Sequence, residues 1–184
     1  AGAVPDWIEL FNNSSQTIDL GGLSLSDDVL IPGKFLFPSN TLIAAQGYLG
    51  LWCDDATNAP GLHTGFGLNN RGQTVVLFTP TANGTVVRDF VTFGLQVPDR
   101  TIGRVLNGTG GWQLTQPTHG QANVVAALGS AAGLKINEWM ATPASGDDWF
   151  ELFNPAALPV LLGGLYLTDI LSNPTNTRVA PLSF

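Results

Sequence analysis

The chain has 184 residues, 44% of them apolar, which is enough to bury a core in one or two domains. Only 11% are charged, while 22 are glycine and 12 are proline, a composition that argues against long salt-bridged helices and favours short strands joined by tight turns. Fourteen acidic against seven basic side chains give a net charge of -7, so we expect neither nucleic acid nor an anionic membrane surface as a partner.

Residues 6–11 alternate with a period of two, a pattern that predicts a strand. One face would carry Trp7, Glu9 and Phe11, and the opposite face Ile8 and Leu10. A further strand signal, leucines flanked by serines, follows at residues 23–26.

Residues 74–78 and 86–93 are also strand-like, and Thr81-Ala82-Asn83-Gly84 lies between them. Because Asn-Gly readily takes the positive φ angles of a two-residue turn, we predict an antiparallel hairpin here. Turn residues recur along the chain at roughly 8 to 15 residue intervals, and no segment keeps a 3.6-residue period. The sequence therefore predicts an all-β chain, either a sandwich or a barrel.

A repeat organises the chain: residues 6–28 recur as residues 148–170 without a gap, with 12 of 23 positions identical. Residues 124–133 carry no charge and mostly small side chains, which suits a connector. We therefore expect a first unit (residues 1–123), this connector, and the start of an incomplete second unit (residues 134–184). The strand-like residues 134–141 have no counterpart before residue 6, so the first unit is expected to lack its opening strand.

Seven short motifs, in order along the first unit, resemble the lamin tail domain family in the form repeated in large bacterial exported proteins. They are residues 6–12, 20–23, 43–48, 62–68, 93–99, 103–105 and 117–123, and residues 135–139 (Lys-Ile-Asn-Glu-Trp) are similar to the family's opening strand. The resemblance implies an immunoglobulin-like antiparallel β-sandwich without enzymatic activity, used for attachment and interaction. Fold resemblance does not identify a ligand.

The resemblance also implies structural roles for the motif positions in both units. These positions are Trp7, Glu9, Asn12, Gly21, Gly22, His63, Phe66, Gly103, Arg104, Asn123, Asn137, Glu138, Trp149 and Glu151.

A sandwich without its first strand would expose an edge of unpaired backbone groups. We hypothesise that a strand from this chain or a neighbouring copy fills that position by strand addition. The candidate donor is the segment Lys135, Ile136, Asn137, Glu138, Trp139, Met140 and Ala141. Pairing of this segment only within residues 134–184 would contradict the hypothesis.

Trp7 and Glu9 recur as Trp149 and Glu151, and an aromatic beside a carboxylate resembles a sugar-binding or acid–base site. Glycoside hydrolysis requires two carboxylates about 5 to 10 Å apart, which one glutamate on a strand does not supply. We favour a packing role for the tryptophans and a hydrogen-bonding role for the glutamates.

Two acidic pairs, Asp27-Asp28 and Asp54-Asp55, are weak calcium candidates, because oxygen-rich loops suit Ca²⁺. Neither pair has the alternating spacing of a calcium loop, and solvated turns or strand-end caps are the favoured interpretation. His63, His119 and Cys53 lack the close paired spacing of zinc sites, and there is no nucleophile elbow or phosphate loop, so we expect no cofactor.

Carbohydrate on the surface is a further possibility, since Asn12, Asn13, Asn83 and Asn107 each begin an N-glycosylation acceptor triplet.

The seven basic residues do not cluster; Arg100 and Arg104 come nearest to a patch, too few to hold a phosphate backbone.

The start of the chain bears on localisation. It begins with Ala-Gly-Ala-Val-Pro and not with a methionine and charged leader, which fits an exported parent with its signal peptide removed, or an excised fragment. The longest apolar stretch, residues 124–134, is interrupted and too short for membrane insertion. We expect a secreted or cell-surface location.

The leading functional hypothesis is a non-catalytic interaction or tethering module that occurs in tandem, with a protein or further copies of itself as partner. The first alternative is a self-assembling subunit of a filament or surface layer, joined by strand donation from residues 135–141. A hydrolase or a calcium-dependent binding domain is the third candidate, and it needs titratable residues gathered in a cleft.

Overall fold

The computed structural model describes residues 5–184, and these residues form an almost wholly β structure with a single 3-10 turn, η1 (Ala131–Gly133). Residues 1–4, where the first unit begins, lie outside the described residues. The strands are β1 (Asp6–Phe11), β2 (Ile18–Asp19), β3 (Ser24–Ser26), β4 (Phe35–Leu36), β5 (Leu42–Ile43), β6 (Tyr48–Cys53), β7 (Gln73–Thr81), β8 (Gly84–Phe93), β9 (Thr101–Arg104), β10 (Trp112–Thr115), β11 (Lys135–Met140), β12 (Trp149–Phe153), β13 (Tyr166–Leu167) and β14 (Thr177–Arg178).

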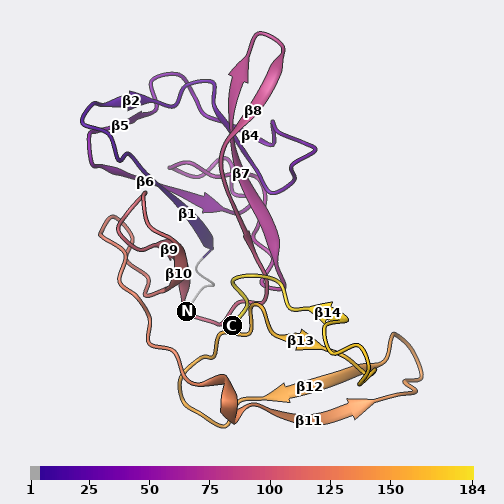
Figure 1. Cartoon of the computed structure of the whole chain (residues 1–184). Helices are drawn as coiled ribbons and strands as arrows, with labels where there is room; N and C mark the ends of the chain where they lie inside the picture. Colours follow the sequence, from indigo (N-terminus) through magenta and orange to yellow (C-terminus); the bar gives the residue numbers. More distant parts are fainter. Residues whose placement is uncertain (1–4) are drawn as a thin grey trace.

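All strand pairs in the named sheets are antiparallel (Figure 1). The largest sheet has four strands in the order β4-β3-β7-β8. Two-stranded pairs β1-β6, β2-β5 and β9-β10 complete the first unit. Tight turns connect these short strands, as the high glycine and proline content predicts.

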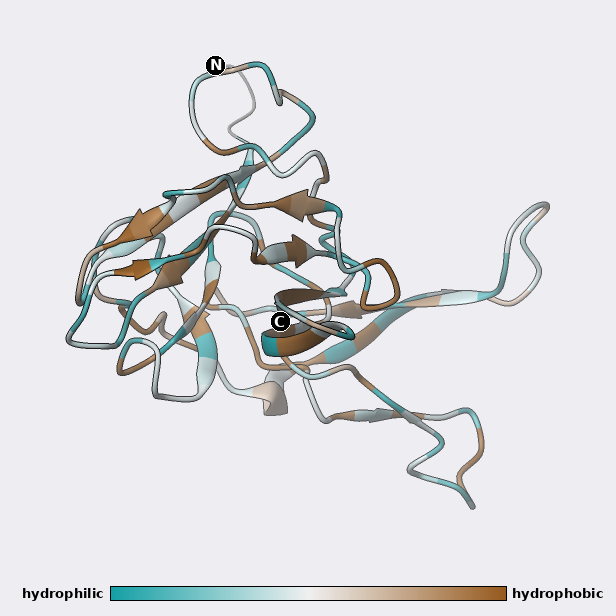
Figure 2. Ribbon diagram, turned by 90° about the horizontal axis from the view of Figure 1, so that it is seen from above, coloured by the Kyte–Doolittle hydropathy of each residue, from teal (hydrophilic) through white to brown (hydrophobic). Residues whose placement is uncertain are grey.

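The main core lies between the β1-β6 ladder and the four-stranded sheet. Ile8 and Leu10 on β1 pack on it, together with the buried Leu51 of β6. The four-stranded sheet contributes Leu25 and Val75, which are 1% and 7% exposed. In Figure 2 the strands of the body are mostly hydrophobic, while many of the connecting loops are not. The predicted two-faced character of residues 6–11 is therefore observed.

The hairpin predicted around Asn83 is formed by β7 and β8, with Ala82 and Asn83 in the turn. The two turn residues are Ala82 and Asn83, one position earlier than the predicted Asn-Gly pair, and positive φ is found at Gly84 (+127°) but not at Asn83. The ladder closes with Thr81 opposite Gly84. Gly84 therefore pairs in the ladder and also has the positive φ angle that glycine adopts without strain.

Asn12, directly after β1, bonds to two stretches of backbone, residues 14–16 and residues 43–44. Its Nδ2 donates to the carbonyl oxygens of Gln16, Ile43 and Ala44 at 2.7, 3.1 and 3.0 Å. Its Oδ1 accepts from the backbone N–H of Ser14 at 3.0 Å. Since the side chain is only 3% exposed, these bonds hold the end of β1 to the β5–β6 connection without competition from water.

The second unit repeats local hydrogen bonds of the first at a constant offset of 142 residues. Leu20 N–H donates to the carbonyl of Thr41 at 2.8 Å, and Leu162 donates to that of Ser183 at 2.9 Å. Further equivalent pairs are Gly22 to Phe37 and Gly164 to Val179, Phe37 to Leu23 and Val179 to Leu165, and Asn12 to Gln16 and Asn154 to Leu158. Similar local sequence thus gives similar turns in both places.

The strand-donor prediction for residues 135–141 is wrong. Lys135–Met140 forms β11, which pairs with β12 inside the second unit, from Lys135 opposite Phe153 to Met140 opposite Trp149. The nearest strand in sequence takes the position, because closing a short loop costs less entropy than pairing with the distant β1. Within the described residues, β1 pairs with β6 alone.

The end of the chain packs against the first unit. Gly94 N–H donates to Pro181 O at 3.0 Å, and Phe184 N–H donates to Leu95 O at 3.0 Å. Phe184 is 9% exposed and joins a second small core with Leu114. A Cβ on Gly94 would lie 1.9 Å from Ser183 Oγ, so only glycine permits this approach. The two units are therefore in direct contact.

Residues 124–126 continue the first unit. Gln116 N–H donates to Val124 O at 2.8 Å, and Ala126 N–H donates to Leu114 O at 2.9 Å. The segment predicted as a connector thus starts alongside β10. No helix among residues 5–184 is long and apolar enough to cross a membrane.

Replacing Asn12 by alanine would leave the buried carbonyl group of Ile43 and the partly buried one of Ala44 without their donor. We expect the free energy of unfolding to fall by about 2 to 3 kcal/mol. The matched control is Asn154→Ala, since Asn154 makes the exposed equivalent bond to Leu158, and there we expect a loss of about 0.5 kcal/mol or less. Urea unfolding followed by tryptophan fluorescence measures both, and equal losses would contradict the role assigned to Asn12.

Candidate functional site

The candidate site is the face of the β1-β6 ladder that points away from the core. Directly opposed residues share a face of a sheet, and here Trp7 lies opposite Trp52 and Glu9 opposite Gly50. Phe11 and Tyr48 form the third pair, with ring centroids 4.9 Å apart. This face is aromatic along its length except at its centre, where Gly50 leaves space above the backbone.

His119 occupies that space. Its ring lies 5.2 Å from the Trp7 ring in an edge-on arrangement and stacks 6.1 Å from Trp52. A Cβ on Gly50 would come within 2.2 Å of His119 Nε2. The neighbouring Gly120 N–H donates to Glu9 Oε2 at 2.6 Å. The loop of residues 117–123 is therefore fixed over the ladder by aromatic contacts and one charge-assisted hydrogen bond.

A second loop covers the other end of this face. Asn107 donates from Nδ2 to the hydroxyl oxygen of Tyr48 and accepts from Asn123 N–H at 3.0 Å through Oδ1. Asn123 Nδ2 in turn donates to Arg104 O at 3.0 Å. A Cβ on Gly103 would lie 2.7 Å from the Asn123 amide, so glycine is needed beside it. Gly103, Arg104 and Asn123 are thus brought together with the candidate face.

The Arg104 side chain bridges neighbouring strands. Its Nη2 lies 2.7 Å from Asp89 Oδ1, and its guanidinium stands 4.3 Å above the Trp112 ring. The positive charge of Arg104, one of the two arginines nearest to a basic patch in the sequence, is therefore used in an ion pair and in ring stacking.

The geometry favours packing over sugar binding or acid–base chemistry at this face. Trp7 is capped by His119, and Glu9 already accepts a backbone N–H. Glycoside hydrolysis needs a second carboxylate across a cleft, and the opposed residue is Gly50.

In the second unit β12 repeats the β1 side of this face as Trp149, Glu151 and Phe153, but its partner strand is β11 and no covering loop is present among the described residues. Glu151 Oε1 accepts from Asn137 Nδ2 at 2.6 Å, and Glu138 lies opposite Glu151 in the ladder. Trp149 is 44% exposed and Trp139 is 71% exposed. The predicted motif positions of this unit therefore lie together, on an open hairpin.

A His–Asp pair holds the loop after β6. His63 Nδ1 lies 2.6 Å from Asp54 Oδ1, and the His63 side chain is only 8% exposed. This hydrogen bond raises the pKa of His63 and lowers the pKa of Asp54. Close by, Thr64 Oγ1 donates to Phe66 O at 2.7 Å and both residues are buried. The pair thus anchors a structural loop.

Burial also explains the state of the single cysteine. Cys53 is 3% exposed, and removal from water raises the pKa of its thiol to about 12. A protonated, buried thiol is a poor nucleophile and a poor metal ligand.

The acidic pairs do not converge. Asp27 pairs with Lys34 at 2.6 Å, and Asp28 Oδ1 accepts from Leu30 N–H at 2.9 Å. Asp54 is occupied by His63, and Asp55 is exposed. Within residues 5–184 no group of three or more His, Cys, Asp or Glu side chains is placed to hold a metal ion.

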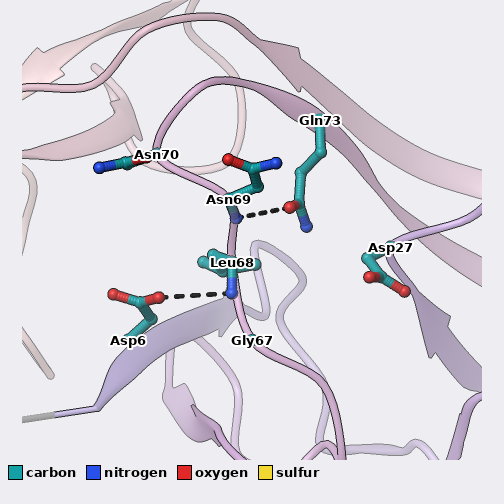
Figure 3. A pocket seen from close by; sticks show the side chains of 7 residues that line it. All are labelled: Asp6, Asp27, Gly67, Leu68, Asn69, Asn70 and Gln73. Atoms are coloured by element: carbon teal, nitrogen blue, oxygen red, sulfur yellow. Dashed lines mark hydrogen bonds between the residues drawn. The ribbon is translucent and has the colours of Figure 1, made fainter. Parts of the chain in front are cut away.

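Asp27 does line an open pocket of about 620 Å³, together with Asp6, Leu68 and Gln73. Figure 3 shows Asp6 and Asp27 on opposite sides of it, with Leu68 between them. Asp6 Oδ2 accepts from Leu68 N–H at 3.3 Å, so it acts as a loop anchor. The two carboxylates do not face each other as cation ligands would.

Of the four asparagines that begin glycosylation triplets, two have their side-chain amide engaged in hydrogen bonds and two do not carry a glycan-blocking contact. Asn12 is 3% exposed and uses Nδ2 for three backbone carbonyls, so a glycan on it is incompatible with this fold. Asn107 also uses its amide, toward Tyr48. Asn13 and Asn83 are exposed and remain sterically open acceptors.

Sequence reasoning did not foresee the roles of Gly50, Trp52, Gly94 or Phe184. The glycines carry a signal, because each lies in an apolar strand or strand end where glycine is disfavoured unless another group approaches closely. The approaching groups, His119 and Ser183, are remote in sequence and leave no local signal.

Gly50→Ala should displace His119, because the added methyl group overlaps its ring. We expect a loss of about 1 to 3 kcal/mol in unfolding free energy and altered tryptophan emission. Gly111→Ala is the matched control, since nothing lies within 4 Å of its Cβ position and its φ is not positive. In the Gly50→Ala background, His119→Ala should recover part of the loss; a strictly additive double mutant would contradict the contact.

The His63–Asp54 pair should make stability depend on pH with a defined sign. The raised pKa of His63 gives stabilisation that is complete below 6.5 and is lost as pH rises through the folded pKa. The lowered pKa of Asp54 gives stabilisation that is complete above 3.8 and is lost as pH falls through its folded pKa. The free energy of unfolding of the wild type should therefore exceed that of Asp54→Asn by the largest amount between pH 3.8 and 6.5.

Urea midpoints across this pH range, with Asp55→Asn as the neighbouring control, measure the difference. A wild-type advantage that stays constant from about pH 5 to pH 9 would show that the pair does not titrate as described.

Comparison with known proteins agrees with this structure. Residues 1–94, just over half of the chain, match the family model of the Lamin Tail Domain. No curated protein and no solved structure matches the chain. The family is one of non-catalytic, immunoglobulin-like interaction modules, and the antiparallel all-β architecture found here is the one predicted. The resemblance carried by the sequence motifs is thus confirmed: the chain belongs to the lamin tail domain family.

Proposed function

We propose that this chain is a non-catalytic tethering module whose fold is used in tandem, in a secreted or cell-surface protein. The supporting observation is the recurrence, 142 residues later, of the hydrogen bonds that shape residues 12–41. Recurrence of the same turns and strand pair at one fixed offset is what a repeated module would produce.

The side chains that could carry chemistry support a non-catalytic role. Glu9, His63 and Arg104 each serve a structural contact, to Gly120, Asp54 and Asp89 respectively. Acid–base catalysis requires titratable groups gathered around a substrate cleft. Within the described residues these groups lie apart, on β1, on the loop after β6 and at the end of β9, and each holds a neighbouring segment in place.

Contact between the units supports a tethering role. The Gly94–Pro181 and Leu95–Phe184 hydrogen bonds, with Phe184 packed beside Leu114, join the second unit to the first. Consecutive modules held by such contacts keep a fixed spacing, unlike modules on a flexible linker. A protein partner, or further copies of the module, is the expected binding partner.

Exposed apolar side chains on the second unit support a role for a further module in covering them. Trp139, Trp149 and Phe150 are 71%, 44% and 46% exposed. The β1 equivalents of Trp149 and Phe150 are Trp7, which is capped by His119 of the 117–123 loop, and Ile8, which packs on the main core. We propose that residues equivalent to 43–123 bury this hairpin when the repeat is whole.

A designed fusion tests the tandem arrangement. Because residue 184 aligns with residue 42 at the repeat offset, a second copy of residues 43–123 attached after Phe184 continues the register. We expect blue-shifted tryptophan emission and a cooperative unfolding transition that includes the second unit, since the graft supplies the missing strands.

The control fusion carries Leu49→Asp and Leu51→Asp in the grafted copy only, because these leucines face the core in the first unit. Both grafts add Trp52 and Trp112, so the control should emit further to the red than the unmodified fusion. Emission that shifts equally in both fusions, or in neither, would contradict a repeated module.

A further inference from the structure

Strand β8 is the open edge of the four-stranded sheet. In the order β4-β3-β7-β8 it has a partner on one side only, and residues 81–90 are all exposed. Val86, Val87 and Phe90 are 51%, 48% and 58% exposed. Figure 1 shows the tip of the β7-β8 hairpin projecting beyond the rest of the molecule. An exposed strand edge with apolar side chains is a template for pairing with another strand.

The sequence of this edge is complementary to itself in the antiparallel direction. Residues 85–92 read Thr-Val-Val-Arg-Asp-Phe-Val-Thr. A two-fold axis between Arg88 and Asp89 would set Arg88 of one copy opposite Asp89 of the other. The remaining opposed pairs would be Thr85 with Thr92, Val86 with Val91, and Val87 with Phe90. Hydroxyl would meet hydroxyl, apolar would meet apolar, and opposite charges would meet at the centre.

A β-bulge makes this pairing consistent with the two faces of the sheet. The β7 ladder sets Phe78 opposite Val87 and Leu77 opposite Asp89, so Arg88 is the extra residue. Without it, Thr85 and Thr92, an odd number of positions apart, would lie on opposite faces. With it, Thr85 and Thr92 lie on the same face.

The remaining pairs follow the same rule. Val87 and Phe90 are opposite Phe78 and Val76, which share a face of β7, and Val86 and Val91 fall on the other face. A two-fold axis perpendicular to the sheet keeps each face on its own side, so every opposed pair would meet face to face.

The charges at the centre are available for this contact. Both intrachain partners of Asp89, the Arg104 guanidinium and Phe90 N–H, bind Oδ1. The Asp89 side chain is 52% exposed, so Oδ2 is open to Arg88 of a second copy. A run of like charge on an edge strand would repel a second copy, whereas adjacent opposite charges form two crossed pairs about the axis.

We propose that β8 pairs with β8 of a second copy of this chain, joining the two four-stranded sheets into one across a two-fold axis. Self-complementarity of charge, size and face selects a second copy over an unrelated extended peptide. This inference goes beyond the tethering role, because it assigns the surface through which tethered modules associate sideways.

Disulfide trapping tests the register. In Thr85→Cys/Thr92→Cys the two thiols would be opposed between copies, while within one chain they are seven residues apart on a strand, about 20 Å and beyond disulfide reach. Cys53 is buried and does not interfere. We expect a covalent dimer on mild oxidation.

The control Val86→Cys/Thr92→Cys carries thiols that are one position out of register and on opposite faces, and it should stay mostly monomeric. Failure of the first variant to form dimers, or equal dimer formation by both variants, overturns the proposed pairing.

Sedimentation equilibrium tests the charges without new thiols. Wild type should show concentration-dependent dimerisation, and Arg88→Glu should weaken it about tenfold or more because each of the two crossed pairs would then hold two acids. Arg71→Glu makes the same charge change in an exposed turn and is the control. Thermal melting confirms that each variant is folded. A wild type that stays monomeric up to about 1 mM, or equal weakening by the control, overturns the proposal.

Discussion

The structure depends on the register of the β1-β6 ladder. With Glu9 opposite Gly50, Ile8 and Leu10 face the core and Trp7 faces outward toward His119. A shift of one residue would move every side chain of β1 to the other face. It would also turn Trp7 and Glu9 away from His119 and Gly120, the residues of the covering loop that they contact. The core and the loop that closes the opposite face are therefore specified by the same register.

The repeat separates local from long-range contributions to the fold. The turn bonds of Leu20 and Gly22 recur at Leu162 and Gly164 because both sets lie within about twenty residues of their partners. Burial does not recur: Leu25 is 1% exposed while its equivalent Leu167 is only half-buried, and Phe150, the equivalent of the half-buried Ile8, is 46% exposed. Local sequence is sufficient for turns and hairpins, but covering an apolar face needs strands supplied from farther along a chain.

These contributions explain what the sequence could predict. The alternation of residues 6–11 and the β7-β8 hairpin are local patterns, and both are present in the structure. The partner of β11 was mistaken, because a strand-like sequence does not specify which edge it joins. The triplet beginning at Asn12 has the glycosylation pattern, yet nothing local shows that its amide will be buried against Ile43 and Ala44. The bulge at Arg88 likewise appears only once the ladder is known.

Most polar side chains of the candidate site make intramolecular contacts, so the surfaces that we propose for association are exposed strands and hairpins. The β7-β8 tip and the β11-β12 hairpin lie at opposite ends of the molecule in Figure 1. Continuation of a tandem array would use the β11-β12 end, and pairing of β8 would use the other end, so neither contact blocks the other. The net charge of -7 opposes close association of copies everywhere except where opposite charges meet. Since Arg88 is one of only seven basic residues and lies on the exposed edge beside an acid, the general repulsion favours the one alignment in which the two charges cross.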